Sequence, residues 1–88
     1  MYENINILKF SMKNCQPCKR YAPIFNEFIE ETGIKSSNVD IDEQHELASK
    51  YNVMSVPTTV FIKNGEVVST QTGAMSKPAL RKMVESFA

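Results

Sequence analysis

Residues 13–19 read KNCQPCK and contain both cysteines of the chain, Cys15 and Cys18. Thiols at this spacing can exchange with disulfides, form a structural disulfide, contribute to a metal site, or stay inert. A structural disulfide here would close a very short loop, worth only about 2 kcal/mol. Zinc prefers four ligands, and the one histidine, His45, lies far along the chain. Redox chemistry is therefore the favoured interpretation, and the other three stay open.

The elements around the pair decide how reactive it can be. Residues 5–12 are apolar and β-branched and predict a strand, and residues 15–31 predict a helix. Cys15 then lies near the helix N-cap, where free N–H groups and the helix dipole should lower the pKa of its thiol below about 8.5. Cys18 lies one turn further, within reach of a disulfide. Pro17 suits the first turn, which needs no N–H from it.

The remaining pattern predicts two further helices and three further strands. Gly33 should end the first helix, which contains Pro23, and Asp42 should cap the second. Asn64-Gly65 is a strong hairpin signal, because both turn positions need positive φ. The predicted segments are a weak strand at 34–42, a helix at 43–52, two strands within 58–72, and a helix at 76–88 capped by Ser76. This β-α-β-α-β-β-α order predicts an α/β fold with a four-stranded mixed sheet, covered by helices on both faces.

Length and composition narrow the function classes. The 88 residues fit a single domain, residues 1–88, and the formal net charge of zero is unlike that of nucleic-acid-binding proteins. No run of eighteen apolar residues or signal peptide is visible, so we expect no membrane association and a cytoplasmic location. Structural disulfides are rare in that compartment. We further expect a monomer.

The chain resembles the thioredoxin family from about Ile5 onward. The matching features are Cys15-x-Pro17-Cys18, Pro23, Val56-Pro57-Thr58, Lys63-Asn64-Gly65 and Gly73. The resemblance implies a thioredoxin-like fold and an enzyme that reduces protein disulfides through Cys15 and Cys18. It also implies a cis bond before Pro57, a loop there that faces the cysteines, and no cofactor. The implied substrate-binding residues are Gln16, Pro17, Val56, Pro57 and Gly73.

The expected partners are disulfide-containing proteins and a regenerating reductant. That reductant would be either a flavoprotein like thioredoxin reductase or glutathione, and the second would make the enzyme glutaredoxin-like. The alternative from another class is a docking module with the same fold and no catalysis. Turnover in an insulin-reduction assay separates an enzyme from such a module.

The chain also departs from the family pattern. It lacks the extra strand and helix that precede Ile5 in typical members, and it has Asn14 and Gln16 beside the first cysteine. Lys9 stands where the family has a buried acid. We expect Lys9 to point outward, because Leu8 and Phe10 look like the better core pair. Three methionines could line a substrate surface, since methionine adapts to varied partners: Met12, Met54 and Met75.

Overall fold

The computed structural model describes residues 2–88 and has a mixed four-stranded sheet with helices on both faces. The element order is β-α-β-α-β-β-α, as the sequence predicts. The elements are β1 (Ile5–Ser11), α1 (Gln16–Thr32), β2 (Lys35–Asp40), α2 (His45–Lys50), β3 (Thr58–Lys63), β4 (Glu66–Thr72) and α3 (Lys77–Phe87). None of the helices within these described residues combines the length and apolar character that a membrane span requires.

The strands lie in the order β2-β1-β3-β4. β1 runs parallel to β2 and antiparallel to β3, and β3 runs antiparallel to β4. Asn64 and Gly65 join the last two strands with φ values of 52° and 81°, so both turn positions have the positive φ that the sequence predicts. A register shift lies between Phe61 and Ile62 on β3.

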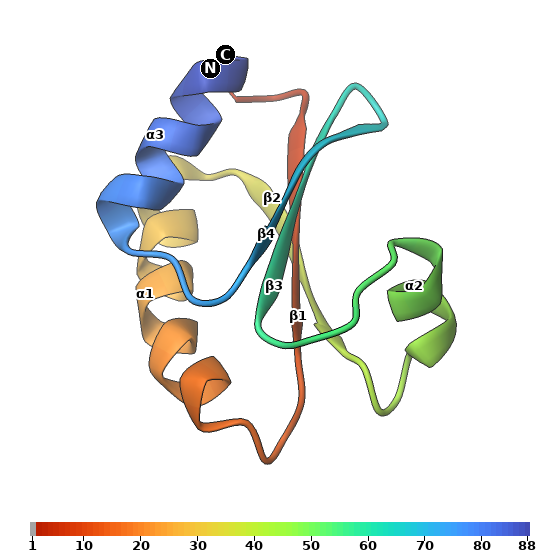
Figure 1. Cartoon of the computed structure of the whole chain (residues 1–88). Helices are drawn as coiled ribbons and strands as arrows, with labels where there is room; N and C mark the ends of the chain where they lie inside the picture. The colour runs from red at the N-terminus through yellow and green to blue at the C-terminus, as the bar shows by residue number, and fades with distance from the viewer. Residues whose placement is uncertain (1) are drawn as a thin grey trace.

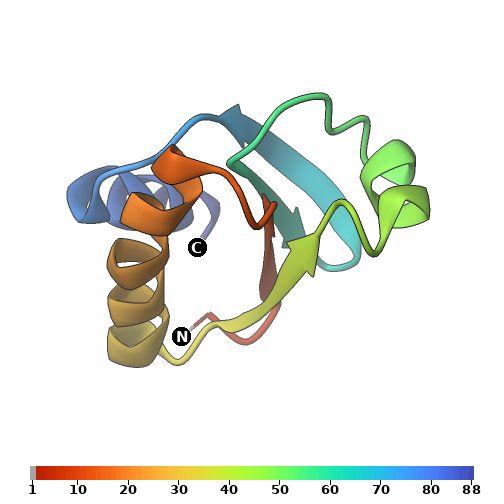
Figure 2. The ribbon, with the colours of Figure 1, turned by 90° about the horizontal axis from the view of Figure 1, so that it is seen from below.

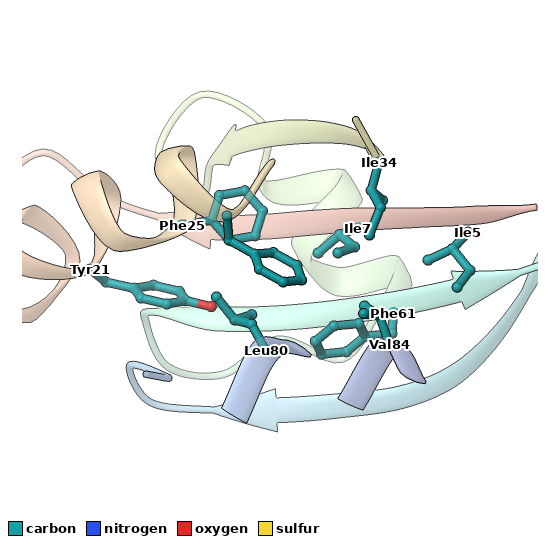
Figure 3. Packing of buried hydrophobic residues seen from close by; sticks show 9 residues of the cluster. Ile5, Ile7, Tyr21, Phe25, Ile34, Phe61, Leu80 and Val84 are labelled. Atoms are coloured by element: carbon teal, nitrogen blue, oxygen red, sulfur yellow. The ribbon is translucent and has the colours of Figure 1, made fainter. Parts of the chain in front are cut away.

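The two faces of the sheet are covered unequally. Figure 1 shows α1 and α3 together on one face and the short α2 on the other. Figure 2, seen from below, shows the same separation. The α1 and α3 face carries the larger buried cluster, shown in Figure 3: Ile5, Ile7, Tyr21, Phe25, Phe28, Ile34, Phe61, Leu80 and Val84. The α2 face has a smaller buried cluster: Phe10, Val39, Ala48 and Val60.

The long helix α1 has identifiable start and stop signals. Cys15 is its N-cap, and it continues through Pro23 to Thr32. Gly33 ends it in the left-handed conformation at φ 70°, and its N–H donates to the Ile29 carbonyl at 2.8 Å. The helix face that packs on the sheet is aromatic and buried: Tyr21, Phe25 and Phe28. The aromatic face of α1 is therefore core, as the sequence predicts.

The predicted cap of α2 is wrong. Gln44 occupies the N-cap position and makes no side-chain capping bond. The N–H groups of Glu43 and Gln44 donate instead to the Asp40 carbonyl, and the Asp42 N–H donates to the Asp40 carboxylate at 2.8 Å. Because Asp40 closes its own turn, the chain enters α2 two residues later than a cap at Asp42 would require.

The predicted cap of α3 is confirmed. Ser76 is the N-cap residue, and its side chain accepts the Ala79 N–H at 3.2 Å. Pro78 lies in the first turn, where its missing N–H costs nothing.

Lys9 points inward, so the expectation of an outward lysine is wrong. It is 5% exposed and lies on the same strand face as Ile5 and Ile7. Leu8 and Phe10 are indeed packed, but against the α2 face. Because helices cover both faces of the sheet, packing of Leu8 and Phe10 on one side does not leave Lys9 in solvent.

Candidate active site

The cysteine pair lies where β1 passes into α1. In this structure the pair forms a disulfide, with the two Cα atoms 5.2 Å apart. As the N-cap residue, Cys15 has an extended backbone, and its sulfur accepts the Cys18 N–H at 3.1 Å. Gln16 and Pro17 form the exposed first turn between the two sulfurs. A negative charge on the Cys15 sulfur would therefore face free N–H groups and the positive end of the α1 dipole.

Both cysteines have little solvent contact. The exposed fraction is 9% for Cys15 and 4% for Cys18. Cys18 points into the helix–sheet layer, one turn before the buried Tyr21. Cys15 is thus the better placed sulfur for contact with a large partner.

A proline loop approaches the pair from the end of α2. The Val56–Pro57 bond is cis, as the family resemblance implies. The Val56 carbonyl oxygen lies 3.9 Å from the Cys15 sulfur. The loop is braced by the Thr58 hydroxyl, which donates to the Ser55 carbonyl at 2.7 Å. Within residues 2–88 the Val56 N–H makes no hydrogen bond, so its backbone is available to a bound chain.

The connection between β4 and α3 completes this end of the sheet. The Gly73 N–H donates to the Pro57 carbonyl at 2.8 Å, and Gly73 has φ 94°, which favours glycine. Figure 1 shows the β1–α1 turn, the α2–β3 loop and the β4–α3 connection at one end of the sheet. The structure therefore brings together every residue that the sequence singles out for the site: Cys15, Gln16, Pro17, Cys18, Val56, Pro57 and Gly73.

The layer beneath the cysteines contains polar groups that sequence reasoning missed. Tyr21 and Thr59 are both fully buried, and their hydroxyl oxygens are 2.7 Å apart. Figure 3 shows the Tyr21 hydroxyl directed from α1 towards the sheet. Burial raises the pKa of Tyr21 to about 12, although the bond to Thr59 favours the ionised form. Thr59 is paired in register with Lys9, which joins this layer. Helical spacing places Tyr21 in the core, but it does not show which strand residue meets its hydroxyl.

The remaining residues that the sequence singles out are His45 and three methionines, and their settings differ. His45 is exposed on α2. Within the described part of the chain, no group of three His, Cys, Asp or Glu side chains could hold a metal ion. Met54 is 96% exposed in the segment leading to Val56, whereas Met12 and Met75 are half-buried.

Comparison with known proteins agrees with this geometry. The family model described as Thioredoxin matches residues 2–86. The chain belongs to the thioredoxin family. It is a thiol–disulfide oxidoreductase with Cys15 and Cys18 as its CxxC pair.

Its relatives come from distant organisms. It is 42% identical over 84 residues to the thioredoxin of Bacillus subtilis, covering 93% of this chain and 81% of that protein. It is 38% identical to thioredoxin-1 of Caenorhabditis elegans, covering 94% of this chain and 73% of that protein.

Solved structures agree with the fold. A mutant thioredoxin from Halobacterium salinarum has a TM-score of 0.91 at 32% identity and covers 97% of this chain and 75% of that one. The oxidised thioredoxin of Plasmodium falciparum has a TM-score of 0.82 at 37% identity and covers 98% of this chain and 83% of that one.

Proposed function

We propose that the protein reduces disulfides of other proteins, with Cys15 as the attacking thiolate and Cys18 as the resolving thiol. The observation that carries this assignment is the different setting of the two sulfurs. Cys15 is at the helix N-cap with its sulfur 3.1 Å from the Cys18 N–H, and Cys18 lies deeper in the layer below. The helix start stabilises a thiolate on Cys15 and makes it the nucleophile at neutral pH.

The reaction proceeds by two exchanges. The Cys15 thiolate attacks a substrate disulfide, forms a mixed disulfide and releases one substrate sulfur as a thiolate. Cys18 then loses its proton and attacks Cys15, which releases the second substrate sulfur. The substrate gains two electrons and, when both of its sulfurs become thiols, two protons. The protein is left with the Cys15–Cys18 disulfide, whose 5.2 Å Cα separation fits that product.

The substrate would bind across the first turn of α1 and the proline loop. Val56 offers an unpaired backbone N–H and a carbonyl beside Cys15, so an extended substrate segment can pair with it. Pro57 and Gly73 hold that loop through their hydrogen bond. Gln16 and Pro17 form the exposed rim through which Cys15 is approached, and Gln16 narrows that approach.

Turnover requires a reductant to restore the dithiol. We propose a flavoprotein of the thioredoxin-reductase type as the source of electrons, because the chain belongs to the family that such enzymes serve. Regeneration by glutathione is the alternative. A cytoplasmic setting suits either supply, since both systems keep thiols reduced there.

Insulin reduction tests the proposal. With dithiothreitol as electron donor, the wild-type protein should accelerate insulin precipitation, and Cys15→Ser should abolish the acceleration. Cys18→Ser should lose turnover but retain substrates as mixed disulfides that dithiothreitol releases. An absence of turnover in the wild-type protein, with no trapped adducts in Cys18→Ser, would instead favour a docking module. Substituting a flavoprotein reductase or glutathione for dithiothreitol then identifies the regenerating system.

A further inference from the structure

Lys9 holds a positive charge inside the protein on the cysteine side of the sheet. It is 5% exposed, and its ammonium nitrogen lies 5.4 Å from the centre of the Phe25 ring. Among residues 2–88 this ammonium makes no hydrogen bond or ion pair, and its nitrogen keeps some contact with solvent although the side chain as a whole is buried. A cation–π contact compensates for only part of the hydration that burial removes. The charge is therefore not neutralised by its surroundings.

This charge lies close enough to act on the cysteine pair. Cys18, Tyr21 and Phe25 follow one face of α1 towards the sheet. Lys9 contacts that face at Phe25, whose backbone lies about two helical turns, or roughly 10 Å along the helix axis, from that of Cys18. Tyr21 and Phe25 fill the intervening layer and are at most 1% exposed. Because protein rather than salt solution separates the charges, screening between them is weak.

No acidic side chain within residues 2–88 forms an ion pair with Lys9. Asn38 on β2 and Thr59 on β3 pair with it in register, and neither is charged. Tyr21 stays neutral at physiological pH, because its pKa is about 12. Asp40 lies on the same face, two residues further along β2, and accepts the Asp42 N–H. The cations of α3 are bound to acids of α1 at the surface: Lys77 to Glu27 and Glu31, and Arg81 to Glu31.

We propose that Lys9 is a positioning residue for the dithiol, whose positive charge stabilises the thiolate form of the cysteine pair and makes the couple more oxidising than a neutral residue would. The inference rests on the proposed dithiol chemistry, not on any particular substrate. Reduction of the disulfide to one thiolate and one thiol takes two electrons and one proton. A nearby cation favours that product over the uncharged disulfide.

The size and pH range of the effect follow from the same geometry. A unit charge about 10 Å away, in a medium of effective dielectric constant about 20 to 40, shifts a thiol pKa by about half a unit to one unit. The influence of Lys9 on the dithiol–disulfide equilibrium should increase as pH rises and the thiolate forms. It should decrease again at higher pH, where Lys9 loses its proton. Burial lowers the pKa of the Lys9 ammonium from its ordinary value, which sets the upper pH limit.

The test replaces Lys9 with a neutral side chain and measures the redox equilibrium. Lys9→Met and Lys9→Gln are equilibrated with glutathione buffers at pH 6, 7 and 8, and the dithiol fraction is quantified by alkylation and mass spectrometry. Both variants should form the disulfide about two- to fivefold more readily at pH 7–8, which corresponds to roughly 10–20 mV. The difference should be smaller at pH 6. The reactive thiol pKa, taken from alkylation rates across pH, should rise in both variants.

Lys82→Met is the matched control, because it removes the same charge from an exposed position on α3. It should leave the equilibrium and the thiol pKa unchanged. A merely structural role for Lys9 would change the melting temperature without this pH-dependent shift. An equilibrium constant equal to that of the wild type, or a shift that is the same at every pH, would overturn the proposal for Lys9 alone. Failure of the wild-type protein to form the disulfide in any buffer would overturn the dithiol chemistry as well.

Discussion

Cys15 and Cys18 are the same chemical group in two different settings. The first is the N-cap of α1 and lies beside the proline loop, whereas the second follows one turn later and points at the buried layer. We expect limiting iodoacetamide near neutral pH to label Cys15 first, because thiolate fraction and access control alkylation. Peptide mapping by mass spectrometry gives the position of the adduct. Preferential labelling of Cys18 would reverse the two roles.

Met54 is a large apolar side chain with 96% of its surface exposed, two residues from Val56. Because methionine adapts to varied partners, a protein bound at the Val56 loop can cover this side chain. Met54→Ser should raise the KM for a protein disulfide about three- to tenfold, as expected for losing part of one buried side chain. The rate with a small disulfide should not change. An equal loss with both substrates would contradict a role in protein recognition.

A buried hydrogen bond between two elements makes the stability of the fold depend on pH. The bond between Tyr21 on α1 and Thr59 on β3 lies in the layer below the cysteines. Because the folded pKa of Tyr21 is about 12 and the unfolded value about 10, its phenol keeps its proton longer in the folded state. The resulting stability is fully present below pH 10 and is lost as pH rises from 10 to 12.

Tyr21→Phe should show this dependence directly. At pH 8 the variant should be less stable than the wild type by about 1 kcal/mol, the usual value of one hydrogen bond. At pH 11 the difference should vanish or reverse, because only the wild type carries the alkaline penalty. Urea unfolding at the two pH values gives both numbers. The other tyrosines and the lysines are common to both proteins and cancel in the comparison. A difference that stays constant from pH 8 to pH 11 would contradict the raised pKa.

The elements themselves could be predicted well from local signals. Helical spacing, the N-cap at Cys15, the Gly33 stop and the Asn64-Gly65 turn all depend on neighbours in sequence, and the structure confirms each. The contact between Val56 and Cys15 came from family resemblance, since 41 residues separate the two positions. Local pattern alone could not supply it.

The wrong predictions have physical causes. In β1 each alternating set of residues contains two apolar side chains, Ile5 and Ile7 in one and Leu8 and Phe10 in the other. Hydrophobicity alone therefore did not decide which set faces the core. Strict alternation from Ile5 and Ile7 would have placed Lys9 inside. The cap of α2 was wrong because Asp40 closes the turn before the helix, where its carbonyl accepts the N–H groups of Glu43 and Gln44, so the helix begins only after Gln44.

The redox potential is a property of the molecule as a whole. The α1 N-terminus and Lys9 favour the thiolate, whereas Gln16 adds no charge and Pro17 keeps the turn stiff, which favours the disulfide. We expect a potential between roughly −270 and −200 mV, the range from thioredoxin to glutaredoxins. Equilibration with glutathione or dithiothreitol measures it. A value near −120 mV, that of a strong oxidant, would contradict the proposed direction of electron flow.

The thin cover on one face of the sheet has a dynamic consequence. α2 has six residues and one buried side chain, Ala48, whereas α1 has 17 residues and four buried ones. The free energy of local opening should therefore be small for α2 and large for α1. In native-state hydrogen exchange, α2 amides should exchange by local opening, whereas those of β1, β3 and α1 should exchange only through global unfolding. Since α2 leads into the Val56 loop, one side of the cysteine site would then yield to an incoming chain while the helix carrying the sulfurs stays rigid.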